Sequence, residues 1–191
     1  MRSGVRRRRH PDRRREVPYE MGLIAVAELG GQLRPLHLRA RAGPVDHLFQ
    51  VIVNFQALAA KKDSDFGAAP EHLTGAWRDR FADETVRLIA AWDAPGAEEG
   101  TSGAMGMPAR TVGAMVVGDL AVHGWDLARA TGQPYEPDAA LVGMLGAEFE
   151  ALAPTALKMG VFGEPVPVGE DAGPFEALLA MTGRDPGWSR P

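Results

Sequence analysis

The chain has 191 residues, of which 45% are hydrophobic and 24% are charged, and its formal net charge is −4. This length and apolar content are enough for one domain with a buried core. The sequence contains no cysteine, which excludes a disulfide framework, a thiolate nucleophile and sulfur metal ligands, so a metal would be held by His, Asp or Glu. No continuous apolar run approaches the roughly 20 residues of a membrane span, and we expect a cytoplasmic protein with no membrane partner.

Charge is distributed unevenly along the chain. Residues 1–42 contain 11 Arg and four acidic residues, a net charge of +7, which leaves −11 for the remainder. Residues 1–16 repel one another and have almost nothing to bury, so we predict that they are disordered. The acidic remainder argues against broad nucleic-acid binding, which requires a basic face.

Three interpretations of the basic N-terminal segment stay open. One is a nucleic-acid-binding arm. Another is a twin-arginine export signal, although the apolar stretch Met21–Leu29 is short, contains Glu28 and precedes no clear cleavage site. The third is that the segment is not a natural N-terminus.

Two amphipathic helices are predicted in the first half of the chain. Apolar residues at three- and four-residue spacing indicate a helix over residues 44–62, with Pro44 in its first turn. A second helix is predicted from Thr74, a good N-cap, to Trp92. The buried face of this second helix is expected to consist of Trp77, Phe81, Val86, Leu88, Ile89 and Trp92.

A central helix is predicted after a loop over residues 93–109, whose end is marked by Pro108. This helix is expected from Arg110 to Ala130, with Gly132 as its terminator. Because it is apolar around most of its circumference, we expect it to lie at the centre of a helical bundle.

The last third of the chain predicts two more helices and a covering segment. A helix is expected from Pro137 to about Leu157, with apolar residues facing inward. Residues 161–168 contain two prolines and predict an extended covering arm rather than a central strand. A short helix, Pro174–Met181, follows, so the sequence as a whole predicts an all-α fold.

Asp119 and His123 lie four residues apart in the predicted central helix. That spacing puts their Cβ atoms about 5–6 Å apart on one face, close enough to share a metal ion. Such a pair is more often a surface ion pair, and a metal site needs a third ligand. His47 lies at the edge of an apolar stripe, where a single His is usually a packed or surface residue.

Asp119 itself and two side chains near the pair have structural interpretations as well. Asp119 is expected among apolar neighbours, where a carboxylate needs a partner because an unpaired buried charge is costly. Trp125 is expected to be a core residue or the lid of a pocket. Asp126 is expected to bond a neighbouring backbone group or Arg129.

The chain resembles DinB-like metal-binding proteins related to the N-terminal domain of mycothiol-dependent maleylpyruvate isomerase. The resemblance rests on Asp119–Gln133, Phe162–Val168 and Leu178–Trp188, and it extends over residues 45–188. It implies a DinB-like four-helix bundle with a short extended C-terminal arm and a small helix.

The resemblance also implies a metal site. The family has one metal-binding His on an early helix and an acidic residue four positions before a His on a later one, which identifies His47, Asp119 and His123 as ligands. The family's acidic ligand is usually Glu, so Asp119 is one methylene shorter. Three ligands would leave the metal an open position, as in catalytic sites. The metal could lower the pKa of bound water or activate a thiol as thiolate.

The implied activity is that of a thiol-dependent isomerase or transferase acting on a small molecule. Divalent zinc is the expected ion for such nitrogen and oxygen ligands, and mycothiol is the implied thiol. Alternatives are a protein that binds metal or a small molecule without turnover, and a degenerate family member without metal. The substrate is not specified, and a homodimer is left open.

The resemblance stops upstream of residue 45. The family has an N-terminal bundle helix and a Thr-Pro-Cys-x-x-Trp-like segment there, and residues 31–44 match neither. We therefore divide the chain into an aberrant or disordered N-terminus, 1–43, and a bundle domain, 44–191. We hypothesise a frameshift or wrong start, with the first bundle helix missing or poorly replaced by Val17–Leu29.

Overall fold

The computed structural model describes residues 38–64, 72–104 and 106–189, so the expectations for the first 37 residues lie outside it. The protein is mostly helical in this part, which confirms the predicted all-α class. The elements are α2 (Leu38–Ala59), α3 (Trp77–Asp93), β1 (Thr101–Ser102), β2 (Met107–Pro108), α4 (Ala109–Thr131), α5 (Ala139–Lys158) and α6 (Pro174–Met181).

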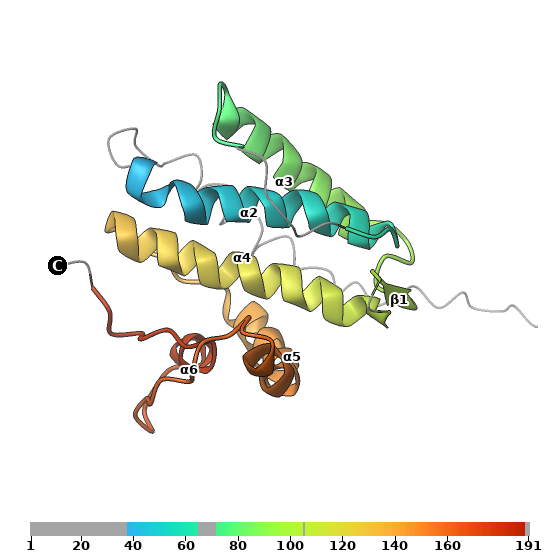
Figure 1. Cartoon of the computed structure of the whole chain (residues 1–191). Helices are drawn as coiled ribbons and strands as arrows, with labels where there is room; N and C mark the ends of the chain where they lie inside the picture. The colour runs from blue at the N-terminus through green and yellow to red at the C-terminus, as the bar shows by residue number, and fades with distance from the viewer. Residues whose placement is uncertain (1–37, 65–71, 105, 190–191) are drawn as a thin grey trace, which may run out of the picture.

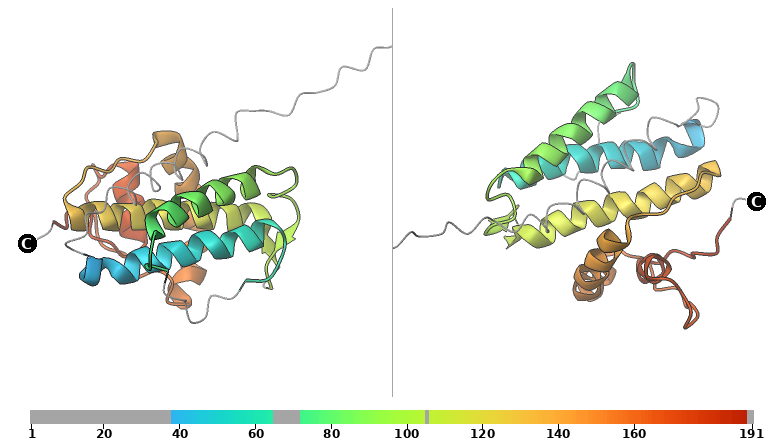
Figure 2. Two further views of the ribbon diagram at one scale, coloured as in Figure 1. Left: turned by 90° about the horizontal axis from the view of Figure 1, so that it is seen from above. Right: turned by 180° about the vertical axis from the view of Figure 1, so that it is seen from behind.

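The helices form two groups that meet at α4. Helices α3, α2 and α4 lie side by side with α2 in the middle (Figure 1). Helices α5 and α6 pack together on the other side of α4, and α5 runs across its axis (Figure 2). Helix α4 is therefore central, as its apolar circumference predicts.

Helix α2 begins earlier than predicted. It starts at Leu38, six residues before Pro44, and so crosses the expected boundary between residues 43 and 44. The Arg and Ala residues before Pro44 are good helix formers, which favours this extension. The helix ends at Ala59, where the Ser102 hydroxyl donates to the Leu58 carbonyl. Its apolar stripe, including Leu48, Val51, Ile52, Phe55 and Leu58, joins the core.

Two predictions for α3 are wrong. Its N-cap is Ala76, without a side-chain hydrogen bond, and not Thr74. The Arg80 guanidinium instead donates to the Thr74 carbonyl at 2.8 Å. Val86, predicted to be buried, is 65% exposed, because the buried face of α3 runs through Phe81, Thr85 and Leu88. Thr85 is buried instead, and its hydroxyl donates to the Phe81 carbonyl at 2.8 Å, which satisfies that polar group inside the core.

The predicted loop before α4 contains a small hairpin. Ser102 pairs with Met107 and Thr101 with Pro108 in antiparallel register. Helix α4 follows directly and ends at Gly132, whose φ of 69° is the left-handed conformation expected of a terminating glycine. The predicted central helix is confirmed within one residue at each end.

Helix α5 and the C-terminal arm close the structure. Asp138 caps α5 by accepting bonds from the backbone amides of Ala140 at 2.9 Å and Leu141 at 3.2 Å. The arm is extended, and the Val166 amide donates to the Ala180 carbonyl at 3.0 Å, so the arm covers α6 as expected. The bounds of α6 agree with the prediction.

Within the described residues, α5 is the one helix long and apolar enough to cross a membrane, with a mean hydropathy of 1.3. It passes this test although Glu148 and Glu150 interrupt its apolar run. Burial is limited to 22% of that stretch, and Leu141, Leu145 and Phe149 are among its buried side chains. The expected absence of a membrane partner stays a prediction.

Candidate metal centre

The structure brings His47 of α2 together with Asp119 and His123 of α4. The His47 Nε2 atom lies 3.6 Å from Asp119 Oδ2, and the His123 Nε2 atom lies 3.5 Å from Asp119 Oδ1. One ligand atom from each residue lies within 4.8 Å of the other two. These three residues could therefore hold a metal ion.

The packing of α2 against α4 creates this cluster. Leu48, Val51 and Ile52 of α2 lie in the same core as the apolar residues of α4. His47 precedes this apolar face, so its imidazole lies at the edge of the interface beside α4. Asp119 and His123 follow each other by one helical turn, so both reach the same edge. The short Asp119 side chain places one carboxylate oxygen toward each imidazole.

The distances suit a shared ion. Ligands bound about 2.0–2.1 Å from zinc at tetrahedral angles lie roughly 3.3 Å from one another. The two imidazole–carboxylate distances of 3.5 and 3.6 Å are close to this separation. Both are longer than an ordinary hydrogen bond between nitrogen and oxygen. The donor set, two imidazoles and one carboxylate, is also one that zinc accepts.

The cluster is open on one side. The side chain of His47 is 52% exposed, that of Asp119 32% and that of His123 21%. A structural zinc site is normally closed by four protein ligands, whereas a catalytic site keeps a position for water or substrate. Three protein ligands at a partly exposed edge would leave such a position open.

A second carboxylate fixes the orientation of His123. Its Nδ1 atom lies 2.9 Å from Asp126 Oδ2. Asp126 in turn accepts bonds from Arg184, from Nε to Oδ1 at 2.9 Å and from a terminal nitrogen to Oδ2 at 2.8 Å. When Nδ1 donates to a carboxylate, the Nε2 lone pair is left for a metal. The contact therefore presents Nε2 toward Asp119 and His47.

The expected partners of Asp126 were wrong. Arg129 lies over the Trp125 ring and donates to the Pro186 carbonyl at 3.2 Å. The partner that the sequence did not indicate is Arg184, which lies 58 positions after Asp126 in the chain. Helical spacing carries no signal for such a contact, because it is made only when the C-terminal tail folds back along α4.

The electrostatics of the site are dominated by its two carboxylates. Burial alone would raise the pKa of Asp119, but the interactions with His123 and His47 outweigh it and lower that pKa to about 2. Burial alone would lower the pKa of His123, yet Asp119 and Asp126 raise it to about 9. Burial opposes ionisation of Asp126 too, but His123 and Arg184 hold the pKa of this carboxyl below its usual value. A proton on His123 thus occupies the position that a metal would take.

Comparison of the chain with models of protein families, with curated proteins and with solved structures found no match. The resemblance drawn from the sequence stays a prediction. The geometry of His47, Asp119 and His123 is the observation on which a function can be built.

Proposed function

We propose that this protein binds one divalent metal ion, zinc in the first place, through His47, Asp119 and His123. The observation that carries the proposal is the convergence of three ligand atoms within 4.8 Å from two helices that are far apart in the sequence. Asp126 and Arg184 support it by holding His123 in the orientation a metal requires. Such an outer shell is typical of zinc-binding histidines.

We further propose that the centre acts on a small molecule together with a thiol, for which mycothiol is the candidate. A bound divalent ion would supply Lewis-acid chemistry, polarising a carbonyl or favouring the thiolate form of a thiol. The exposed side at His47 leaves room for such a ligand. The thiol itself is supported by the sequence resemblance alone, so it needs its own test.

Metal content tests the site. The protein would be purified without added metal, reconstituted with zinc, desalted and analysed by elemental mass spectrometry. We expect one zinc per chain, and almost none in His47→Ala and His123→Ala. The matched control is His72→Ala, because His72 bonds Gln50 and lies outside the cluster. Equal, near-zero zinc in the wild type and His123→Ala would end the proposal.

Cobalt substitution tests the thiol. Cobalt(II) in the site would report its coordination by visible absorption, and addition of a thiol should produce a sulfur-to-cobalt charge-transfer band. His47→Ala should lack this band. A cobalt-loaded protein whose spectrum does not respond to mycothiol or another thiol would leave a metal-binding protein without thiol chemistry.

A further inference from the structure

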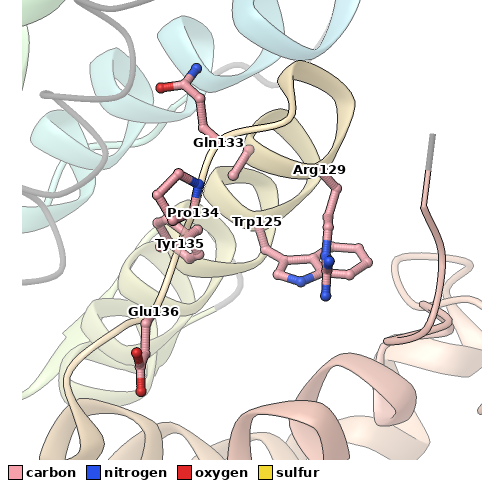
Figure 3. A pocket seen from close by; sticks show the side chains of 7 residues that line it. Trp125, Arg129, Gln133, Pro134, Tyr135 and Glu136 are labelled. Carbon is pink, nitrogen blue, oxygen red and sulfur yellow. The ribbon is translucent and has the colours of Figure 1, made fainter.

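A pocket of about 290 Å³ lies on a different side of α4 from the metal ligands. It is formed by Trp125, Ala128 and Arg129 of the helix and by residues 133–136 of the following segment (Figure 3). Trp125 is two positions from His123, which turns it about 200° around the helix. Trp125 is buried at this pocket, in agreement with its expected role as core or lid. None of the three metal ligands lines the pocket.

The Tyr135 hydroxyl is an unused polar group at this site. It is buried and has no hydrogen-bond partner among the described residues. It lies against the backbone of α4, since a Cβ atom built on Gly124 would be 2.9 Å from it. Burial raises the pKa of Tyr135, so the hydroxyl keeps its proton. With almost no accessible surface and the α4 backbone against it, the hydroxyl belongs to the wall between the pocket and the helix and does not reach a ligand.

The Arg129 guanidinium is the accessible donor at this site. It lies 5.4 Å from the centre of the Trp125 ring and uses one N–H group on the Pro186 carbonyl. No carboxylate in the described part of the chain forms a salt bridge with it. Figure 3 shows the Glu136 and Gln133 side chains turned away from Trp125 and Arg129. The pocket therefore combines a flat aromatic wall with an unneutralised cation.

We propose that this pocket binds a small aromatic monocarboxylate. Trp125 and Pro134 would flank the ring, and the Arg129 guanidinium would pair with the carboxylate. Arginine is well suited to carboxylates because its planar fork can make two parallel bonds. The pocket is close to the lower end of the usual volume for small-molecule sites, which suits one substituted ring. Glu136 at the rim disfavours a second negative charge on the ligand.

Binding of benzoate to the full chain, stripped of metal with a chelator, tests the proposal by calorimetry or ligand-observed NMR. We expect benzoate to bind at least about tenfold more tightly than neutral benzamide, since a hydrogen bond to a charged group is worth more than one to a neutral group. Arg129→Gln should weaken benzoate binding at least about tenfold and abolish the preference over benzamide. Tyr135→Phe should leave benzoate binding unchanged, because the Tyr135 hydroxyl does not reach the ligand.

Two controls separate this site from the metal centre. Glu136→Gln keeps the pocket and should bind benzoate at least as well as the wild type. His47→Ala should leave binding unchanged, because the pocket does not depend on the metal. Arg129 is exposed, so its replacement should not prevent folding. Equal affinity in Arg129→Gln, or binding that needs metal and His47, would overturn the proposal and assign the carboxylate to the metal centre.

Discussion

The two halves of α4 do different work in the fold. The first half touches its neighbours through glycines, with Gly113 against the Trp92 ring and Gly118 against the Phe149 ring. The second half is also closely packed, with Gly124 against the Tyr135 ring, but it carries in addition Asp119 and His123, whose partners are polar side chains from α2 and the C-terminal tail. Close packing along both halves fixes the position of the helix. The second half can then hold charged groups at defined distances, which loosely packed polar groups could not maintain.

The largest expected effect is a loss of stability when the close contact between Gly118 in the first half of α4 and Phe149 is disrupted. A Cβ atom at Gly118 would lie 2.0 Å from Phe149 Cζ, so Gly118→Ala forces the ring or the helix to move. We expect the free energy of unfolding to fall by about 1–3 kcal/mol or more. Urea denaturation measures it. A fully stable variant would show that this contact does not fix α4.

Gly143→Ala is the matched control for Gly118→Ala. Gly143 is also a helical glycine, but nothing lies within 4 Å of a Cβ built there. This variant should gain up to about 1 kcal/mol, because alanine favours helix over glycine. The double variant Gly118→Ala/Phe149→Leu should recover part of the loss.

The contribution of Asp119 and His123 to the stability of the metal-free protein should depend strongly on pH. The pKa of His123 is raised from 6.5 to about 9, so without metal its contribution to stability is complete below pH 6.5 and is lost as the pH rises through 9. The pKa of Asp119 is lowered from 3.8 to about 2, so its contribution is present above pH 3.8 and is lost as the pH falls through 2. Denaturation of metal-free protein across this range measures both trends.

The affinity for zinc should rise with pH over the alkaline range in which the stability of the metal-free protein falls. Zinc must displace the His123 proton, so its affinity should rise about tenfold per pH unit up to pH 9. Competition with a coloured chelator at several pH values measures this slope. His123→Ala should remove the trend in metal-free stability, whereas His72→Ala should keep it. A zinc affinity independent of pH would contradict a metal on His123.

Removing Asp126 should weaken the metal centre while leaving the contact between Gly118 and Phe149 intact. We expect Asp126→Ala to lower zinc affinity about 10–100-fold, because His123 loses the carboxylate that orients it. Asp126→Asn keeps a hydrogen-bond acceptor but not the charge. Its zinc affinity should lie between that of the wild type and that of Asp126→Ala. Chelator competition measures the affinity, and Glu150→Gln on the exposed side of α5 is the control. Unchanged zinc affinity in Asp126→Ala would remove this residue from the site.

The smallest effect is expected at Arg184, which bonds Asp126 and also has a terminal nitrogen 3.5 Å from His123 Nδ1. Arg184→Gln should lower zinc affinity by less than Asp126→Ala does. In the double variant the two losses should not add, because Asp126, Arg184 and His123 belong to one network of contacts. Additive losses would indicate that Arg184 acts on His123 independently of Asp126.

Sequence patterns alone determined the helical class and several element bounds. Periodic apolar residues, the glycine at position 132 and the proline at 174 mark α4 and α6 correctly, because these are local signals. The one-turn spacing of Asp119 and His123 is equally local. His47, by contrast, was singled out by the resemblance, since nothing in its own helix distinguishes it from a packed histidine.

Only the tertiary structure decided how these local pieces combine. It brought His47 to the Asp119–His123 pair, supplied Arg184 to Asp126 and left Val86 exposed while burying Thr85. Local periodicity tells which residues share a face of a helix. It does not tell which face another segment will cover or which distant side chain will reach it. Those contacts depend on the packing of whole elements, so the metal cluster and the Arg129 pocket exist only in the folded chain.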